Sequence, residues 1–242
     1  MILEEMTTVE VEAALKSCRS VFIPFGVMEA HGPHLPLSTD TIQAYDAGKR
    51  AAALVPLFVA PPIPYGYCRS LGGHVGTISV SAETVRAMVR DVVQSLYQSG
   101  LRNFILYSGH ASALQMASIE EAAERLLRSC PDANIAIVLE YDVLLKRMAG
   151  IIETAGDMHA GEIETSRLLS ICPELVRTEL LPEESGRETP KPLLVRDVRR
   201  YWPSSVLGAP RKATAEKGDR LGAIVAEYLA DLVKRMEAFE PH

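Results

Sequence analysis

The stretch SVFIPFGVMEAHGPHLPLSTD, residues 20–40, decides the fold prediction for this chain. It begins with a short apolar run of β-prone residues that ends at Gly26. After residue 39, the apolar positions Ala44, Ala47 and Ala51 recur at the spacing of one helix face. A continuous apolar strand followed by an amphipathic helix is typical of a parallel sheet covered on both faces.

The same alternation continues along the chain. Residues 57–67 (LFVAPPIPYGY) are predicted to be a strand that leaves the core into a proline-rich loop. Strands are also predicted at 76–81 (GTISVS), 103–110 (NFILYSGH) and 133–142 (ANIAIVLEYD). A helix is predicted between a Ser81 N-cap and Gly100, with others over residues 113–130, 159–172 and 214–239. We therefore predict an α/β fold, a three-layer α/β/α sandwich with a mostly parallel central sheet.

The length favours one globular domain, residues 1–242, because a chain of this size can bury a large core. Residues 173–212 are rich in proline and show no sustained hydrophobic period. We expect this segment to be a long loop or excursion near the functional site or an interface. Loops of that length are uncommon without a function.

Composition excludes several classes of function. The formal net charge is −6, and no cluster of basic and aromatic residues suits a phosphate backbone. The four cysteines form no CxxC pair, so neither a zinc knuckle nor a disulfide framework is expected. The N-terminus is acidic where a signal peptide is basic, and no apolar run reaches the ~18 residues of a membrane span. We expect a cytoplasmic protein without nucleic-acid or membrane partners.

Acidic and imidazole side chains follow two of the predicted strands. Glu29, His31 and Asp40 come after the first strand, and His110 comes after the strand at 103–107. Ligands in open α/β sheets bind beyond the carboxyl ends of the strands, so we expect these groups to converge. A third segment, GDMHAGEIETS, adds four more candidates at the start of a predicted helix: Asp157, His159, Glu162 and Glu164.

Carboxylate and imidazole ligands together suit Zn, Mn or Fe(II). No sulfur is expected in this cluster, which argues against a structural zinc site. Glu29, His31, Asp40, His110 and one more carboxylate make five protein ligands. Five ligands are too many for one catalytic ion with an open position, and they suit two ions that share a bridging aspartate and water. The sequence predicts a site for two divalent ions.

Plainer interpretations compete with metal binding. A single histidine near a strand end is more often a hydrogen-bonded structural residue than a ligand. His74 fits either the mouth of the site or the cap of a turn. A covalent mechanism has weak support, because YSGHAS lacks the GxSxG elbow and Cys68 has no base nearby in sequence. Four of the six histidines lie in three short Gly-containing segments, which favours the metal site.

The motifs resemble those of the creatininase (creatinine amidohydrolase) family. Residues 24–40, PFGVMEAHGPHLPLSTD, are similar to the family's Pro-x-Gly-x-x-Glu-x-His-Gly-Pro-His-Leu-Pro-Leu-x-Thr-Asp pattern. Further similar segments follow in the family's order: YGYCRSLGGHVGTIS, SGHAS, HAGEIETS and SSVLGAPRKATAEKG. These segments are distributed across nearly the whole chain.

The resemblance implies an α/β/α metal-dependent amide hydrolase with two ions of Zn, Mn or Fe, a small-molecule substrate and a homo-oligomeric, often hexameric, assembly. By position, Glu29 and His110 hold one ion, His31 the other, and Asp40 bridges them. Creatininase has a further Glu ligand where this chain has Ser112. The remaining expected roles are Glu164 as fifth ligand with Glu162 in reserve, His159 as proton donor to the leaving nitrogen, and His34 as a residue that orients a ligand.

Departures from the family pattern concern the pocket more than the metal ligands. The flap aromatic is replaced by Ala155, and an Asn before Gly109 is replaced by Ser108. The expected substrate-binding positions are Cys68, Ser70 and His74, which also differ from creatininase. We therefore predict hydrolysis of a carbon–nitrogen bond other than a peptide bond, in a small or cyclic amide other than creatinine. Two alternatives remain: a lactone or peptide hydrolase, and a non-catalytic metal-binding relative. An anionic substrate could be bound by an Arg at 69, 187 or 211.

Overall fold

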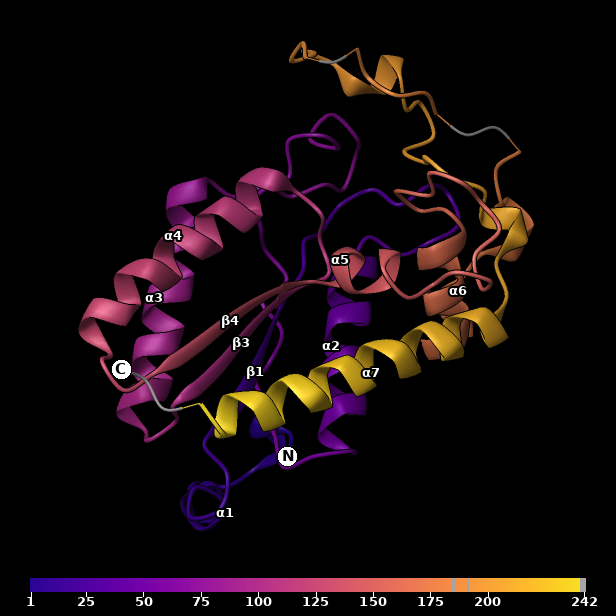
Figure 1. Cartoon of the computed structure of the whole chain (residues 1–242). Coiled ribbons are helices and arrows are strands. Elements are labelled where there is room, and N and C mark those ends of the chain that lie inside the picture. The colour runs from indigo at the N-terminus through magenta and orange to yellow at the C-terminus, as the bar shows by residue number, and fades with distance from the viewer. Residues whose placement is uncertain (184–185, 191, 240–242) are drawn as a thin grey trace.

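Four parallel strands form the central sheet, in the order β2-β1-β3-β4 (Figure 1). In the computed structural model, which describes residues 1–183, 186–190 and 192–239, the long central pair is in register from Ser20↔Asn103 to Phe25↔Ser108. All three strand pairings are parallel. The strands are β1 (Ser20–Phe25), β2 (Phe58–Val59), β3 (Asn103–Ser108) and β4 (Asn134–Leu139).

Helices follow the strands along the chain, and several begin at the expected capping residues. Ser81 accepts a hydrogen bond from the Thr84 N–H at the start of one helix, and Thr214 accepts one from the Lys217 N–H at the start of another. The helices are α1 (Thr8–Ala14), α2 (Thr39–Ala52), α3 (Ala82–Gln98), α4 (Ala113–Ser129), α5 (Glu140–Leu145), α6 (Glu162–Ile171) and α7 (Ala215–Glu237).

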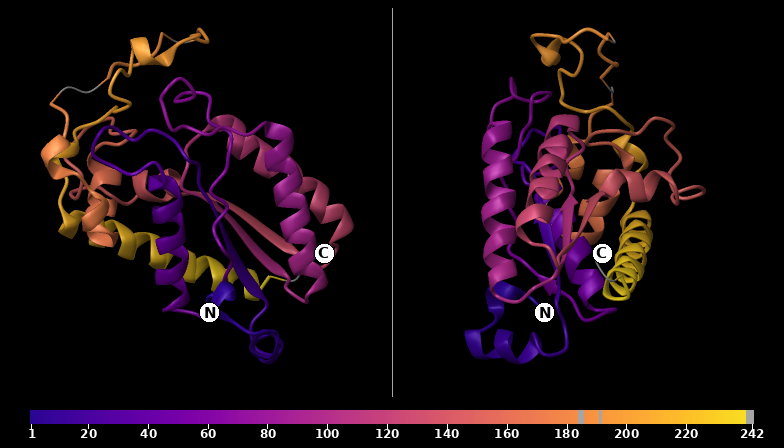
Figure 2. Two further views of the ribbon diagram at one scale, coloured as in Figure 1. Left: turned by 180° about the vertical axis from the view of Figure 1, so that it is seen from behind. Right: turned by 60° about the vertical axis from the view of Figure 1, so that its left-hand side comes forward.

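The two faces of the sheet pack against different helices, as Figure 2 shows. Alternate strand residues point to opposite faces. Val21 and Ile23 of β1 pack with α3 and α4, whereas Phe22 packs with α2 and α7. Both faces of β1 and β3 are buried throughout, which explains why these strands are continuous apolar runs. The predicted three-layer α/β/α sandwich is confirmed.

One predicted strand, residues 76–81, is wrong. Ile78 forms an isolated antiparallel bridge with Met28, and Ser79 forms an isolated parallel bridge with Gly66. The segment contacts the loops that follow β1 and β2 instead of lying along a strand. The segment therefore lies outside the sheet despite its alternating pattern. Its residue Ile78 is exposed, as expected for a segment that no sheet neighbour covers.

Residues 173–212 contain short 3-10 helices within the described part of the segment: η2 (Pro173–Leu175), η3 (Thr178–Leu180), η4 (Val198–Arg200) and η5 (Pro210–Lys212). The orange part of this segment extends away from the sheet in Figures 1 and 2. Its end returns to the centre of the protein, where Leu207 pairs with His159 and the Gly32 N–H donates to Ser205 Oγ. Across the described ranges, no helix has the length and apolar character needed to span a membrane.

Candidate metal centre

Three chain segments bring acidic and imidazole side chains together beyond the carboxyl ends of β1 and β3. The loop after β1 carries Glu29 and His31, the loop after β3 carries His110, and the turn before α6 carries His159. Each of these residues is buried. The convergence that the sequence predicted for parallel strand ends is therefore present in the structure.

Two glycines allow the backbone to approach closely enough for Asp40 to join this group. Gly32 adopts φ +69°, and a Cβ there would also lie 2.7 Å from His34 Nδ1. A Cβ on Gly109 would lie 2.3 Å from the carbonyl oxygen of Asp40. The chain therefore turns back after His31, and Asp40 enters the first turn of α2 beside the end of β3.

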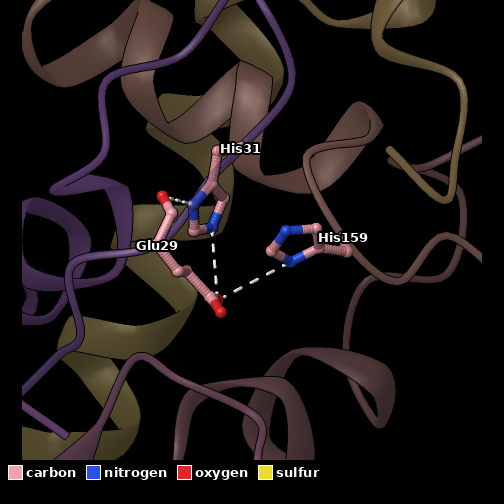
Figure 3. A group of neighbouring side chains, drawn as sticks. All are labelled: Glu29, His31 and His159. Carbon is pink, nitrogen blue, oxygen red and sulfur yellow. Dashed lines mark hydrogen bonds and ion pairs between the residues drawn. The ribbon is translucent and has the colours of Figure 1, made fainter. Parts of the chain in front are cut away.

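Three histidines share one pattern of hydrogen bonds. His31 Nδ1 lies 3.1 Å from the Glu29 carbonyl, His110 Nε2 lies 3.2 Å from the Tyr67 carbonyl, and His159 Nε2 lies 2.9 Å from the Ala30 carbonyl. A carbonyl only accepts, so each of these nitrogens carries a proton and the other ring nitrogen is left for a different partner. In all three residues this other nitrogen faces the carboxylates, and Figure 3 shows this for His31 and His159 beside Glu29.

Asp40 lies between two of these histidines. Its Oδ1 is 3.2 Å from His31 Nε2, and its Oδ2 is 3.1 Å from His110 Nδ1. Glu29 Oε1 is 3.0 Å from His110 Nδ1. His31 Nε2 and Asp40 Oδ2 are buried and make no hydrogen bond with the described residues. Buried polar atoms without a hydrogen bond are costly, and a bound cation would satisfy both of them.

Glu164, and not Glu162, points into this cluster. Glu164 Oε2 lies 3.6 Å from His31 Nε2 and accepts a hydrogen bond from the Ala160 N–H. Glu162 points the other way, where it lies 2.6 Å from Lys217 Nζ. Two residues along a helix face different directions, so only one of these acids can reach the site. The geometry favours Glu164 of the two candidates.

The start of α6 holds Glu164 and His159 in place. Asp157 accepts hydrogen bonds from the Glu162 and Ile163 N–H groups, which lie in the first turn of the helix. Ala160, between His159 and the helix, adopts φ +49°, a conformation that is rare for a residue with a side chain. Such backbone conformations are found most often at functional sites.

Cys68 corrects the expectation that the cluster contains no sulfur. Its side chain is buried, and its Sγ donates to Glu29 Oε2 at 2.6 Å. Possible ligand atoms of Glu29, Cys68 and His110 lie within 4.8 Å of one another. No sequence pattern indicated this contact, because residue 68 joins the cluster from a loop far from Glu29 along the chain.

The buried charges shift one another's pKa values strongly. Burial alone would raise the pKa of Glu29, but His110, His159 and His31 hold it well below its usual range. Burial alone would lower the pKa of His110, but Glu29 and Asp40 outweigh it and raise that pKa to about 10. The shifts come from pairing carboxylate with imidazole charges, and a bound divalent cation would supply positive charge at the same place.

A small pocket of about 90 Å³ opens onto the cluster. Ser70 lines it, as expected, whereas Cys68 contacts Glu29. His74 is half-buried, and its pKa is lowered by burial and by Arg199. Ser112 also lines the pocket.

Two aromatic residues of the pocket were missed by the sequence analysis. Trp202 comes from the long 173–212 segment, and its ring stacks on His159 at a centroid distance of 6.0 Å. Tyr141 follows β4, and its buried hydroxyl makes no hydrogen bond with the described residues. An aromatic residue in an irregular loop or after a strand carries no local signal of function, so only the tertiary structure places these two.

Of the three arginines considered for an anionic substrate, one lies at the pocket. Arg69 lines it, whereas Arg187 packs over the ring of Tyr201 and Arg211 donates to the Leu181 carbonyl. His34 lies beside the cluster, with its Nε2 2.9 Å from Thr165 Oγ1. His34 thus contacts the helix residue that follows Glu164 and not a candidate ligand itself.

The fold and the site define the class of the protein: an α/β protein with a buried acid and histidine cluster at the carboxyl edge of a parallel sheet. The chain belongs to the creatininase family, because the family model described as creatininase, creatinine amidohydrolase, matches residues 4–233.

Relatives within this family have different described activities. The chain is 33% identical to a mycofactocin precursor peptide peptidase of Mycobacterium ulcerans (strain Agy99), over 92% of this chain and 86% of that protein. It is 28% identical to a creatinine amidohydrolase of Pseudomonas putida, over 98% and 96% of the two chains. It is also 28% identical to a 3-dehydro-scyllo-inosose hydrolase of Thermotoga maritima, over 98% and 84%.

Solved creatininase structures share the fold. One described as creatinine amidohydrolase (creatininase) superimposes with a TM-score of 0.88 at 23% identity, over 97% of this chain and 96% of that chain. Another, with a TM-score of 0.86 and 25% identity over 97% of both chains, is described as a mutant creatininase of the Zn–Zn type.

Proposed function

We propose that the protein is a metal-dependent amidohydrolase that cleaves a carbon–nitrogen bond of a small or cyclic amide with a metal-activated water. The observation that carries this proposal is the shared arrangement of three histidines. Each has one ring nitrogen bound to a backbone carbonyl and the other turned towards buried carboxylates. This is the arrangement of histidines that bind metal ions, since the outer hydrogen bond fixes the ring and its tautomer.

The residues divide into two sets of ligands. Glu29 and His110 form one set and His31 and Glu164 the other, and each oxygen of Asp40 faces one set. We propose that they hold two divalent ions, Zn and/or Mn, with Fe as a further option. Bound there, such ions would polarise a carbonyl group and lower the pKa of a bound water towards about 7.

His159 is the residue we assign to proton transfer. Its Nε2–H donates to the Ala30 carbonyl, so Nδ1 is the nitrogen left for proton transfer, and it lies 3.9 Å from Glu29 Oε1. Nδ1 can accept a proton at the cluster and pass it to the leaving nitrogen. Trp202 stacks on the ring and restricts its movement, and both residues line the small pocket.

Peptide cleavage is a second candidate, because the site continues into an outer pocket of about 190 Å³. The outer pocket shares Arg69, Ser70, Met158 and Trp202 with the small one. A chain that extends beyond the reacting bond would find room there. The peptidase relative favours this candidate. The inosose hydrolase relative favours a lactone or another ring as substrate. Ser112 motivates the alternative that the protein binds metal but is not an enzyme.

Metal removal and replacement test the proposal. The protein is freed of metal by a chelator, reloaded with Zn or Mn, and assayed against small amides, cyclic amides, lactones and short peptides. We expect two ions per chain and activity that disappears with the metal and returns with it. Hydrolysis that survives verified metal removal would contradict the mechanism, and metal binding without hydrolysis of any substrate class would favour the non-catalytic relative.

Three expectations from the sequence stand as parts of this proposal. They are a single domain over residues 1–242, an assembly of identical subunits and a cytoplasmic location. Size-exclusion chromatography with light scattering measures the assembly directly. A monomer at micromolar concentration would contradict the expected assembly of identical subunits.

A further inference from the structure

Cys68 is the one member of the buried cluster that the roles above leave unused. Cys68 is 2% exposed, and its Sγ lies 2.6 Å from Glu29 Oε2. Its sulfur lies within 4.8 Å of candidate ligand atoms of Glu29 and His110. The three side chains are therefore close enough to bind one ion together.

We propose that Cys68 is a thiolate ligand of the ion held by Glu29 and His110. This inference rests on the two-ion site proposed above. It adds one sulfur atom to one of the two sites and leaves the other with oxygen and nitrogen ligands alone.

The loop that carries Cys68 also orients His110. The carbonyl of Tyr67 accepts the hydrogen bond from His110 Nε2, and the N–H of Cys68 donates to Ser79 Oγ at 2.9 Å. Consecutive residues thus turn the free nitrogen of His110 and the sulfur of Cys68 towards Glu29. Such support by neighbouring hydrogen bonds is what holds a ligand set in position.

The thiol would lose its proton when it binds the ion. Burial raises the pKa of Cys68, and Glu29 raises it further, so the free side chain is a thiol that donates to the carboxylate. A coordinating thiol is deprotonated outright, and the proton is released to solvent. The Cys68–Glu29 hydrogen bond is then replaced by two bonds to the same cation.

A sulfur ligand would make the two sites unequal. Glu29, Cys68, His110 and one oxygen of Asp40 supply four protein atoms, the number that closes a tetrahedral zinc site. His31, Glu164 and the other oxygen of Asp40 supply three, the number typical of a catalytic zinc ion with an open position. Thiolate ligands also select Zn over Mn. We therefore expect Zn at the Cys68 site and either metal at the other.

X-ray absorption spectroscopy at the zinc edge tests this ligand in the full chain loaded with two Zn ions. We expect a sulfur shell at about 2.3 Å beside a nitrogen and oxygen shell at about 2.0–2.1 Å. Cys68→Ser is expected to lose the sulfur shell. Cys18→Ser is the matched control, because Cys18 is also 2% exposed but precedes the amino end of β1, and it should keep the shell.

The outcomes separate this inference from the function on which it rests. Two zinc ions per wild-type chain without a sulfur shell would overturn the Cys68 ligand and leave the two-ion site intact. Failure of the wild-type chain to retain zinc would overturn both. The wild-type spectrum decides the question even if Cys68→Ser folds poorly. In Zn/Mn competition, Cys68→Ser should retain more Mn than Cys18→Ser, and equal retention would count against the inference.

Discussion

At the scale of single residues, the partner of the ring distinguishes the histidines that face the acids from the one that does not. His31, His110 and His159 each donate to a backbone carbonyl and turn the other ring nitrogen towards acids. His34 instead pairs with the hydroxyl of Thr165. Side chains of one type therefore take different roles, because the backbone around each one fixes a different nitrogen.

Replacement of His159 by Gln should reduce hydrolysis by about 10²–10⁴-fold, the usual contribution of a positioned proton donor. The two-ion content should not change, because the proposed ligand sets do not include His159. Steady-state rates together with elemental analysis check both statements. A rate within tenfold of wild type would remove His159 from the proton-transfer step.

The two acids of α6 offer a matched pair of variants. Glu164→Gln should lose one ion per chain, because a neutral amide replaces a proposed ligand beside His31. Glu162→Gln should keep both ions and lose about 1–3 kcal/mol of stability, since its buried carboxylate pairs with Lys217. Elemental analysis and chemical unfolding of both variants measure these effects. Loss of an ion from Glu162→Gln alone would reverse the assignment.

His34 should make stability depend on pH. Burial lowers the pKa of His34 to about 4, so the folded protein keeps this ring neutral. Below about pH 6.5 the His34 ring binds a proton in the unfolded chain but not in the folded protein. The free energy of unfolding should therefore fall between about pH 6.5 and 4, by at most about 3 kcal/mol. Urea unfolding of His34→Asn over this range should show a smaller slope than wild type, and identical slopes would contradict the prediction.

At the scale of elements, one buried arginine connects the helices behind the site. Arg167 of α6 is fully buried, with its guanidinium 3.3 Å from Glu140 of α5 and 3.2 Å from Asp46 of α2. Its Nη1 lies 3.5 Å from the carbonyl of Gly218 in α7. The orientation of α6, and with it the place of Glu164, therefore depends on a polar contact within an apolar layer.

Arg167→Met should destabilise the protein by about 3–5 kcal/mol, because it leaves Glu140 buried without its charge partner. The double variant with Glu140→Gln should recover part of this loss, since the uncompensated charge is gone. Arg90→Met is the control: it breaks an exposed pair with Asp91 and should cost about 0–1 kcal/mol. Guanidinium unfolding measures all three. Equal losses of unfolding free energy in the two single variants would show that the buried pair stabilises the protein no more than the exposed one.

At the scale of the whole molecule, the cluster joins segments from widely separated parts of the chain. Glu29, Cys68, His110 and Glu164 come from four different loops or helices, and Trp202 adds a fifth segment. A ligand that binds only the assembled site stabilises the folded state as a whole. Ions at this site would therefore act on global stability as well as on activity.

Zinc at about 100 times its dissociation constant should add about 2.7 kcal/mol per site to the free energy of unfolding. Chelation should lower the melting temperature, and added zinc should restore it. Asp40→Asn should show a much smaller zinc-dependent shift, because each of its oxygens faces one ligand set. Calorimetry with and without zinc measures these shifts. A wild-type melting temperature that does not respond to zinc would contradict the two-ion site.

The sequence by itself determined the sandwich and most of the cluster, because both depend on local patterns. Continuous apolar runs such as 20–25 require burial on both faces, and parallel strands bring their carboxyl ends, with Glu29 and His110, to one edge. The failed strand at 76–81 shows the limit of such patterns, since alternation there reflects contact with loops.

Only the tertiary structure turned Glu164, and not Glu162, towards His31, brought Cys68 to Glu29 and placed Trp202 on His159. These contacts join residues whose separation along the chain has no fixed relation to distance in space. They depend on the direction in which α6 presents its first turn and on the path of two irregular loops. No hydrophobic period specifies such paths, because they are set by packing between elements.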